Sequence, residues 1–341
     1  MFLAAAILAR VRFATSFLAA SSLAALVLVA HGCGGGSSCQ TRFLSIGTGG
    51  TGGVYYPYGG ALARLISEKV PCVQATAEVT GASVDNLKLL QQGKVDLAFT
   101  LADALSEASQ GTGPFEGTGG LANLRAIAVL YTNYTHVVVR ADSGVRRVAD
   151  LRGKVVSVGS PGSGTELLAD RVLAAAGLLP RQHITRHTLG VSESAGALKD
   201  GKLDAFFWSG GVPTAAIQDL AATPGLKIAL LSQEELLPRL LPLRNGALYR
   251  LAIVPAGTYR GIAQDTPTIG VSNLLVVPAA LEDALVETIL RTMFDNKPAL
   301  VAAHPEAAHL EPLTSAAGLP VELHPGALKY YRESGAMKNV P

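Results

Sequence analysis

The chain is poor in the residues that most often build metal centres, disulfide frameworks and charged binding surfaces. Of its 341 residues, three are cysteine, one is tryptophan, and 16% are charged. Three cysteines without a C-x-x-C pair are too few for a structural zinc site, so we expect no metal. A net charge of +2 gives no general attraction for nucleic acid, which we therefore exclude as a partner.

Apolar residues are plentiful, and many of them lie at the start of the chain. Residues 1–32 contain Arg10 and Arg12, then a long apolar stretch, then small residues. This order is typical of an export signal peptide, although a membrane anchor is the alternative. The apolar stretch, Phe13 to Ala30, is at the short end for a membrane span. We therefore predict that the protein works outside the cytoplasm.

Each of the three cysteines has a predicted role in that compartment. Cys33 follows Ala-His-Gly and precedes a Gly/Ser run. That arrangement is similar to a bacterial lipoprotein cleavage site, so we predict lipidation of Cys33 and a tether over residues 33–41; an ordinary cleaved signal is the alternative. Cys39 and Cys72 each precede a predicted strand. We predict a disulfide between them, because exported proteins meet oxidising conditions; two buried thiols are the alternative.

Strands, glycine turns and helices alternate from residue 42 onwards, as in βαβ units with a parallel sheet. The long β-rich stretch 124–140 could cross to a second lobe, after which the same order of features repeats. QQGKVDLAFT in the first half compares with KDGKLDAFFW in the second. After residue 249, β-like runs and a helix near 279–300 return the chain. We predict one lobe from residues 42–138 and 249–341, and another from residues 139–248.

Two glycine-rich loops point to an anionic ligand. IGTGGTGGVYY (46–56) has the G-x-G-x-x-G spacing of a dinucleotide turn, and GSPGSGT (159–165) is its counterpart in the second lobe. Amides at a helix start bind any anion, so the spacing alone does not specify a nucleotide. Tyr55 and Tyr56 would crowd a pyrophosphate, and Thr165 lacks the preceding Lys of a Walker motif. We expect no cofactor.

Several segments resemble a known family. GTGGTGGVYYPYGGALA, TGASVDNLKLL, DLRGKVVSVGSPGSGTE, LKDGKLDAFFWSGGVP and LHPGALKYYRESG resemble, in this order, segments of the TAXI family, the extracytoplasmic solute-binding subunits of TRAP transporters. The resemblance implies an α/β, type II periplasmic-binding-protein fold, with two lobes, two hinge strands and a ligand cleft. It also implies capture of a small carboxylate, glutamate-like or dicarboxylate, and its delivery to a TRAP permease. A periplasmic sensor of the same fold is the alternative.

The chain departs from the family pattern at two places. Ala82 stands where the family commonly has the second glycine of Gly-Gly-Ser, and Leu and Ala precede Asp103 where a polar pair is common. Both departures leave the shape of the pocket, and hence the ligand, open.

Residues from five segments are the predicted ligand contacts. Ser83 and Asp103 could instead cap helices, and Trp208 could be core. We predict no enzyme, because Ser163 lacks a G-x-S-x-G setting and His183 and His187 fall far apart on one predicted strand. The predicted contacts are Gly49, Thr51, Gly53 and Tyr55; Ser83 and Asn86; Asp103; Ser160, Gly162, Ser163, Gly164 and Thr165; and Trp208, Gly211 and Pro213.

Overall fold

The computed structural model describes residues 39–243 and 245–337. The predicted signal peptide, the predicted lipidation at Cys33 and most of the predicted tether lie outside these residues. In the described ranges, no helix combines the length and the apolar character needed to cross a membrane. The described residues from Gln40 onwards form one compact unit.

The first lobe begins with alternating strands and helices. Strand β1 pairs in parallel with both β2 and β3, so the glycine-rich turns that follow the strands meet at one edge of the sheet. The elements are β1 (Arg42–Gly47), α1 (Tyr55–Lys69), β2 (Val73–Glu78), α2 (Ser83–Gln91), β3 (Leu97–Leu101) and α3 (Ala102–Gln110).

Strand β4 (Leu124–Arg140) carries the chain into the second lobe, with the bounds that its run of β-branched and aromatic residues predicts. The strand–helix alternation then resumes, with β5 parallel to both β6 and β7. The elements are β5 (Val155–Ser157), α4 (Gly164–Ala175), β6 (Thr185–His187), α5 (Val191–Lys199), β7 (Ala205–Gly210), α6 (Ala215–Ala222), β8 (Ile228–Leu230) and α7 (Leu237–Leu240).

The chain returns to the first lobe later than the predicted boundary at residue 249. Strand β9 (Tyr249–Val254) pairs with the first half of β10 (Thr266–Pro278), and the second half of β10 pairs with β3. The loop between them stays with the second lobe, because the Tyr259 hydroxyl accepts from the Thr214 N–H. The return strand is therefore β10.

The last helices cover the first lobe. The predicted helix near 279–300 is two helices, α8 (Asp283–Asp295) and α9 (Lys297–Ala303), because Pro298 fits only in the first turn of a helix. Two short elements, η5 (Pro305–His309, a 3-10 helix) and α10 (Pro312–Ser315), precede α11 (Pro325–Glu333).

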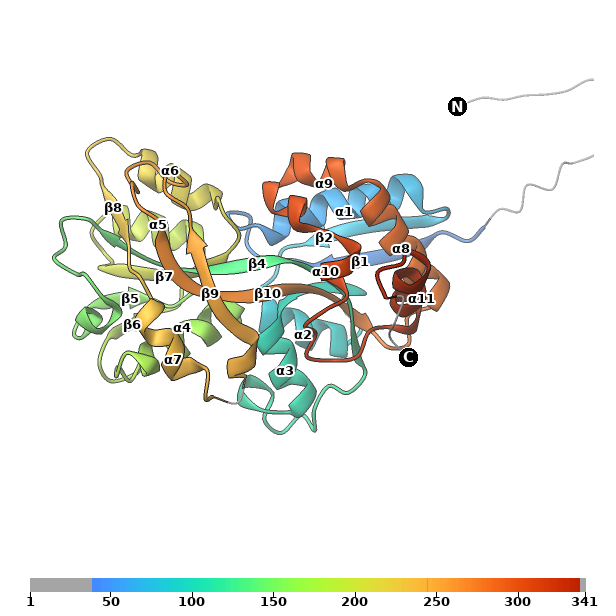
Figure 1. Cartoon of the computed structure of the whole chain (residues 1–341), viewed down its shortest axis with the longest axis horizontal. Coiled ribbons are helices and arrows are strands. Elements are labelled where there is room, and N and C mark those ends of the chain that lie inside the picture. Colours follow the sequence, from blue (N-terminus) through green and yellow to red (C-terminus); the bar gives the residue numbers. More distant parts are fainter. Residues whose placement is uncertain (1–38, 244, 338–341) are drawn as a thin grey trace, which may run out of the picture. The chain divides into compact units, whose positions relative to one another are not determined.

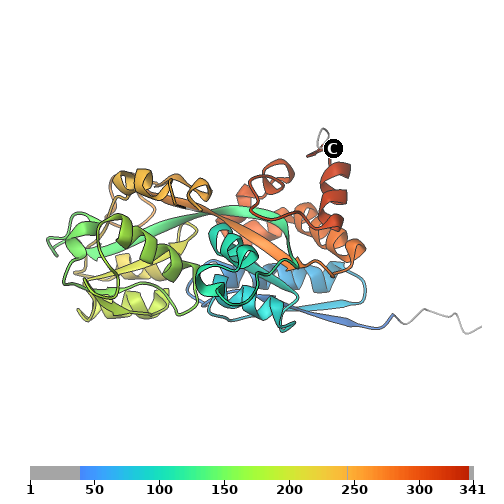
Figure 2. The same ribbon diagram turned by 90° about the horizontal axis from the view of Figure 1, so that it is seen from below.

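One sheet joins the two lobes. Its order is β2-β1-β3-β10-β4-β7-β5-β6, with β8 beside β4 and β9 beside β10. Strands β4 and β10 are antiparallel neighbours that run lengthwise between the lobes (Figures 1 and 2). The predicted α/β fold, with two lobes joined by two strands, is confirmed.

The two lobes share a hydrophobic core on one face of the sheet. Leu87 of α2, Leu105 of α3 and Leu168 of α4 are fully buried and belong to one cluster, which continues onto β4 and β10. On the other face each lobe has its own cluster, beneath α1 and α8 in the first and beneath α5 and α6 in the second. The lobes are therefore packed together along α2, α3 and α4.

Cys39 and Cys72 are both disulfide-bonded in the structure. The Arg42 N–H donates to the Cys72 carbonyl at 2.8 Å, which sets the turn before β2 beside the start of β1. The bond between these two cysteines stays a prediction.

Candidate functional site

A cavity of about 230 Å³, the central pocket, lies where the carboxyl ends of the parallel strands of both lobes meet. Both glycine-rich loops face it, one from each lobe. Its lining consists of Gly49, Gly50, Thr51, Gly52, Gly53, Val54, Tyr55, Gly81, Ala82, Ser83, Leu101, Tyr131, Asn133, Ser160, Ser163, Gly164, Thr165, Gly190, Val191, Ser192, Glu193, Trp208, Ser209 and Gly210.

Ten of the predicted contacts lie in this lining, and their binding of a ligand stays a prediction. They are Gly49, Thr51, Gly53, Tyr55, Ser83, Ser160, Ser163, Gly164, Thr165 and Trp208. Five others do not line the pocket, namely Asn86, Asp103, Gly162, Gly211 and Pro213.

Four helices have both their N-cap and their first residue in the lining of the central pocket: α1, α2, α4 and α5. The first amides of a helix have no partner within the helix, and they carry its positive dipole end. At α2, the N–H groups of Val84 and Asp85 both donate to the Gly162 carbonyl, at 3.1 and 3.0 Å. The starts of α1, α4 and α5 also lie in the lining, and at α4 the Glu166 N–H is already used by the N-cap Ser163, at 3.0 Å. No Lys, Arg or His stands among the lining residues.

The residues at the start of α5 line the central pocket but were not among the predicted contacts. The helix begins at Val191, after Gly190 as its N-cap. A glycine followed three residues later by Glu193 is the available signal, because an acidic residue in the first turn favours a helix start. Tyr131 and Asn133 on β4 were missed too, since nothing in a long β-run marks which residues face a pocket.

A chain of hydrogen bonds forms one wall of the central pocket and links the lobes. The Tyr55 hydroxyl donates to the Asn273 side chain, which in turn donates to Asn133. The Asn133 amide donates to the Ser209 hydroxyl at 3.3 Å. Burial raises the pKa of Tyr55 far above its ordinary value, so its hydroxyl keeps its proton. The chain fixes β4 and β10 relative to α1 and β7.

Trp208 spans the gap between the lobes. A Cβ on Gly53 would lie 2.7 Å from Cη2 of the indole, so the ring rests on the first loop and only glycine fits beneath it. The indole Nε1–H donates to Thr214 at 2.8 Å. Since it is the only tryptophan, its fluorescence reports on how closely the lobes approach.

Asn86 supports the first loop instead of lining the pocket. Its Nδ2 donates to the carbonyls of Gly47, Thr48 and Phe99, and its Oδ1 accepts from Thr80. Every polar atom of this fully buried amide is satisfied within the first lobe, which leaves none for a ligand.

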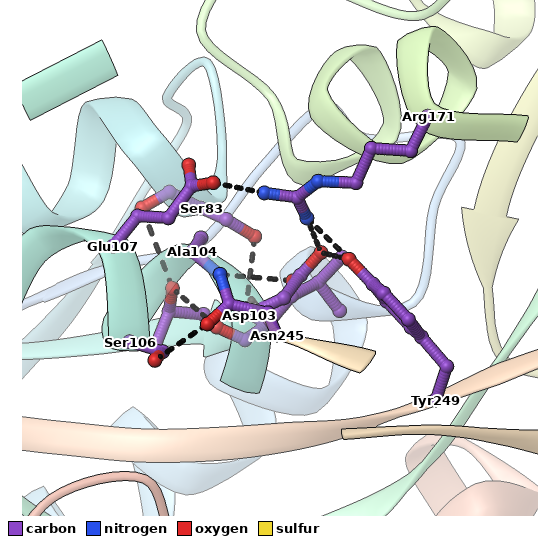
Figure 3. A network of polar contacts seen from close by, with 10 residues as sticks. Ser83, Asp103, Ala104, Ser106, Glu107, Arg171, Asn245 and Tyr249 are labelled. Atoms are coloured by element: carbon purple, nitrogen blue, oxygen red, sulfur yellow. Dashed lines mark hydrogen bonds and ion pairs between the residues drawn. The ribbon is translucent and has the colours of Figure 1, made fainter. Parts of the chain in front are cut away.

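Asp103 is held by a cation of the protein itself. The side chain is fully buried, and its carboxylate pairs with Arg171 of α4 and accepts from the Tyr249 hydroxyl (Figure 3). Arg171 also pairs with Glu107. Burial lowers the pKa of Arg171, but the attractions to Asp103, Tyr249 and Glu107 together outweigh this effect and leave that pKa above its ordinary value. The sequence could not place Arg171, 68 residues away, beside Asp103.

Gly162, Gly211 and Pro213 lie at contacts between the lobes. Gly162 has φ +72° and turns its carbonyl onto α2, a backbone geometry that favours glycine. The segment from Gly211 to Pro213 meets η5 of the first lobe, where the Val212 N–H donates to Glu306 at 2.6 Å. With the Asp103–Arg171 pair, these contacts hold the lobes in a closed arrangement.

Ala82 has a conformation that suits glycine. Its φ of 74° and ψ of −145° lie outside the regions open to residues with a Cβ, and it lines the central pocket. The departure from the Gly-Gly-Ser pattern of the TAXI family is therefore a point of backbone strain in the site.

A model of the NMT1-like family matches residues 46–335. The chain belongs to the NMT1-like family. Solved structures that resemble this NMT1-like protein include the alkanesulfonate-binding protein SsuA from Xanthomonas axonopodis pv. citri bound to MOPS. The two sequences are 18% identical, the match covers 87% of this chain and 92% of that chain, and the TM-score is 0.48. An ancestral arginine-binding protein bound to arginine has 17% identity, coverage of 78% and 99%, and a TM-score of 0.48. Likeness at this level says nothing about the ligand.

Replacing Gly164 with alanine should hold the lobes of this NMT1-like protein apart. A Cβ there would lie 2.5 Å from Leu101 Cδ1 and 2.7 Å from Ser83 Oγ, both in the opposite lobe. Overpacking of this kind costs about 1–3 kcal/mol, so solute affinity should fall about 10- to 100-fold while each lobe stays folded. Native mass spectrometry of the solute retained on purification measures this. Gly196→Ala, in α5 with open space around it, is the control; equal retention by both variants would contradict the closed arrangement.

Replacing Ala82 with glycine should stabilise the NMT1-like protein. Relief of the positive φ outweighs the greater freedom of glycine in the unfolded chain, so the free energy of unfolding should rise by about 1 kcal/mol. Urea denaturation measures this. Ala174→Gly, at an exposed position in α4, should have the opposite sign. A loss of stability in both variants would show that Ala82 is unstrained.

Because of Glu306, the free energy of unfolding should fall as the pH rises. Burial raises its pKa from 4.5 to about 7, although the Val212 N–H acts in the opposite direction. The folded state therefore favours the protonated acid, and this stabilisation is complete below pH 4.5 and lost as the pH rises through 7.

Glu306→Gln should match the wild type at pH 4.5 and exceed its stability at pH 8 by about 3 kcal/mol. Urea denaturation at the two pH values measures the difference. Glu235→Gln, at an exposed side chain, controls for the loss of one negative charge. A difference between Glu306→Gln and the wild type that does not change with pH would contradict the assignment.

Proposed function

We propose that the protein is an extracytoplasmic solute-binding protein that captures a small carboxylate and delivers it to a TRAP-type membrane permease. The observation that carries this proposal is the central pocket between two closed lobes, with the starts of α1, α4 and α5 and no cationic side chain in its lining.

The chemistry of the lining suits a carboxylate. Backbone amides at the starts of α1, α4 and α5 point their positive ends at the pocket. The hydroxyls of Thr51, Ser160 and Ser192 add donors from both lobes. Hydrogen bonds to a charged group contribute about 1.5–3 kcal/mol each, so a few of them can hold an anion without an arginine.

The size of the pocket favours a small solute. Its volume of about 230 Å³ lies below the roughly 300–1,000 Å³ that is typical of sites for drug-sized ligands. A dinucleotide would need a longer groove, and Tyr55, packed against Phe99 with ring centres 5.1 Å apart, occupies the space beside the first loop.

Closure of the two lobes would couple solute binding to recognition by the permease. Contacts of Gly162 with α2 and of Arg171 with Asp103 join the lobes. A solute that contacts both glycine-rich loops binds the closed state better than the open one, and so shifts the protein towards closure. A permease that recognises the closed surfaces of both lobes would then accept only the loaded protein.

Transport is favoured over catalysis. Ser163 Oγ accepts from the Glu166 N–H at 3.0 Å, which is the role of a helix N-cap, and no histidine stands in the lining to act as its base. The resemblance of the glycine-loop segments to the TAXI family supports a TRAP permease as the partner. Export by the predicted signal peptide, with or without a lipid on Cys33, would place the protein beside that permease.

Titration of the purified protein with small carboxylates tests the proposal. Alanine, glutamate, pyruvate, 2-oxoglutarate and succinate should include ligands of micromolar or better affinity by calorimetry, and these should change the fluorescence of Trp208. Vesicles that carry the cognate permease should take up such a ligand only when the protein is present. Binding without uptake would favour the sensor alternative, and a preference for cations would contradict the proposal.

A further inference from the structure

Three helices that start at the central pocket carry an acidic residue at the same position, the third of the helix. These residues are Asp85 in α2, Glu166 in α4 and Glu193 in α5. An acid at this position commonly serves its own helix start, since it accepts from nearby backbone amides. The three residues can therefore be compared directly.

Two of the three carboxylates are used within the protein. Asp85 accepts from the Gly81 N–H at 2.9 Å. Glu166 accepts from the Gly162 N–H at 2.9 Å and pairs with Arg186 at 2.8 Å. Neither residue lines the central pocket.

Glu193 differs on both counts. It lines the central pocket, and within the described residues it has no hydrogen bond or ion pair. A Cβ on Gly190 would lie 2.4 Å from its Oε2 and 3.3 Å from the Ser160 hydroxyl, so the carboxylate rests over Gly190 beside Ser160. It is the one carboxylic acid side chain in the lining.

The side chain of Glu193 is exposed, and the start of α5 that carries it lies close to the opposite lobe. Its neighbour Ser192 reaches the first glycine-rich loop, because a Cβ on Gly52 would lie 2.1 Å from Ser192 Oγ. A solute bound between the two loops therefore lies within the field of this carboxylate. A solute with negative charge alone would be repelled by Glu193, whereas a solute that also carries a cation would neutralise it.

We propose that the solute carries an ammonium group beside its carboxylate, as a 2-amino acid does, and that Glu193 accepts hydrogen bonds from that ammonium group. The helix starts hold the carboxylate, and Glu193 discriminates the amino acid from the 2-oxo acid of the same carbon skeleton. This inference rests on the proposed function, since it names the class of carboxylate that the site takes.

Matched ligand pairs test the role of Glu193. The purified protein is titrated by calorimetry with alanine and pyruvate, with glutamate and 2-oxoglutarate, and with leucine and 4-methyl-2-oxopentanoate. In the pair that binds best, the amino acid should bind at least about tenfold more tightly than the oxo acid, which corresponds to about 1.4 kcal/mol. Glu193→Gln should remove this preference by weakening the amino acid and leaving the oxo acid unchanged or tighter.

The control is Glu235→Gln, which removes a negative charge from an exposed side chain outside the pocket lining and should keep the preference. Oxo acids that bind the wild type as tightly as amino acids would overturn the role of Glu193 but leave the carboxylate function standing. So would an equal loss of both ligands in Glu193→Gln. If no member of the three pairs binds and succinate does, the inference fails alone; if no carboxylate binds at all, the proposed function fails with it.

Discussion

Backbone amides at helix starts supply the positive potential of the central pocket, and much of the structure serves to bring them together. They come from different lobes, since α1 belongs to the first and α4 and α5 to the second. These helix starts lie close together because the parallel strands of both lobes have their carboxyl ends at the central pocket. Glycines are also needed where a side chain would hold the loops apart. Gly52 against Ser192, Gly164 against Leu101 and Gly53 beneath Trp208 are such approaches.

The cationic side chain of Arg171, on α4, is used in a contact between the lobes. Arg171 pairs with Asp103 and Glu107 across the lobes, and Asp103 is fully buried there. A buried carboxylate of this kind is costly without its partner, so the pair links the closed arrangement to the position of α4. Because Arg171 is used between the lobes, the lining of the central pocket contains neutral hydrogen-bond donors and one carboxylic acid, Glu193. Buried Glu306 contacts the second lobe, because its carboxyl group accepts from the Val212 N–H.

The sequence predicts the fold well because its signals are local. Glycine turns between apolar runs mark the βαβ units, and the run 124–140 gives the bounds of β4. The return through β10 was placed too early, because Tyr249–Val254 has a strand pattern and only its pairing shows which lobe it joins. The two glycine-rich loops were found for the same local reason.

Asn86 and Asp103 were predicted as ligand contacts because of their places along the chain. Asn86 lies near the start of a helix, and Asp103 follows the end of a strand, which is where ligands gather in parallel sheets. Asn86 is satisfied by three carbonyls of its own lobe, and Asp103 by an arginine on a distant helix. Such partners are fixed by tertiary packing, which one sequence does not reveal. The start of α5 was not among the predicted contacts, although Gly190 and Glu193 mark it in the sequence.

A crystal structure of the protein with its bound solute tests the central claim most directly. We expect carboxylate oxygens of the solute within about 3 Å of amide nitrogens at the starts of α1 and of α4 or α5, with no lysine or arginine in contact. A solute held in the central pocket by an arginine or lysine side chain, or one bound in a single lobe with the opposite glycine-rich loop turned away, would contradict the account.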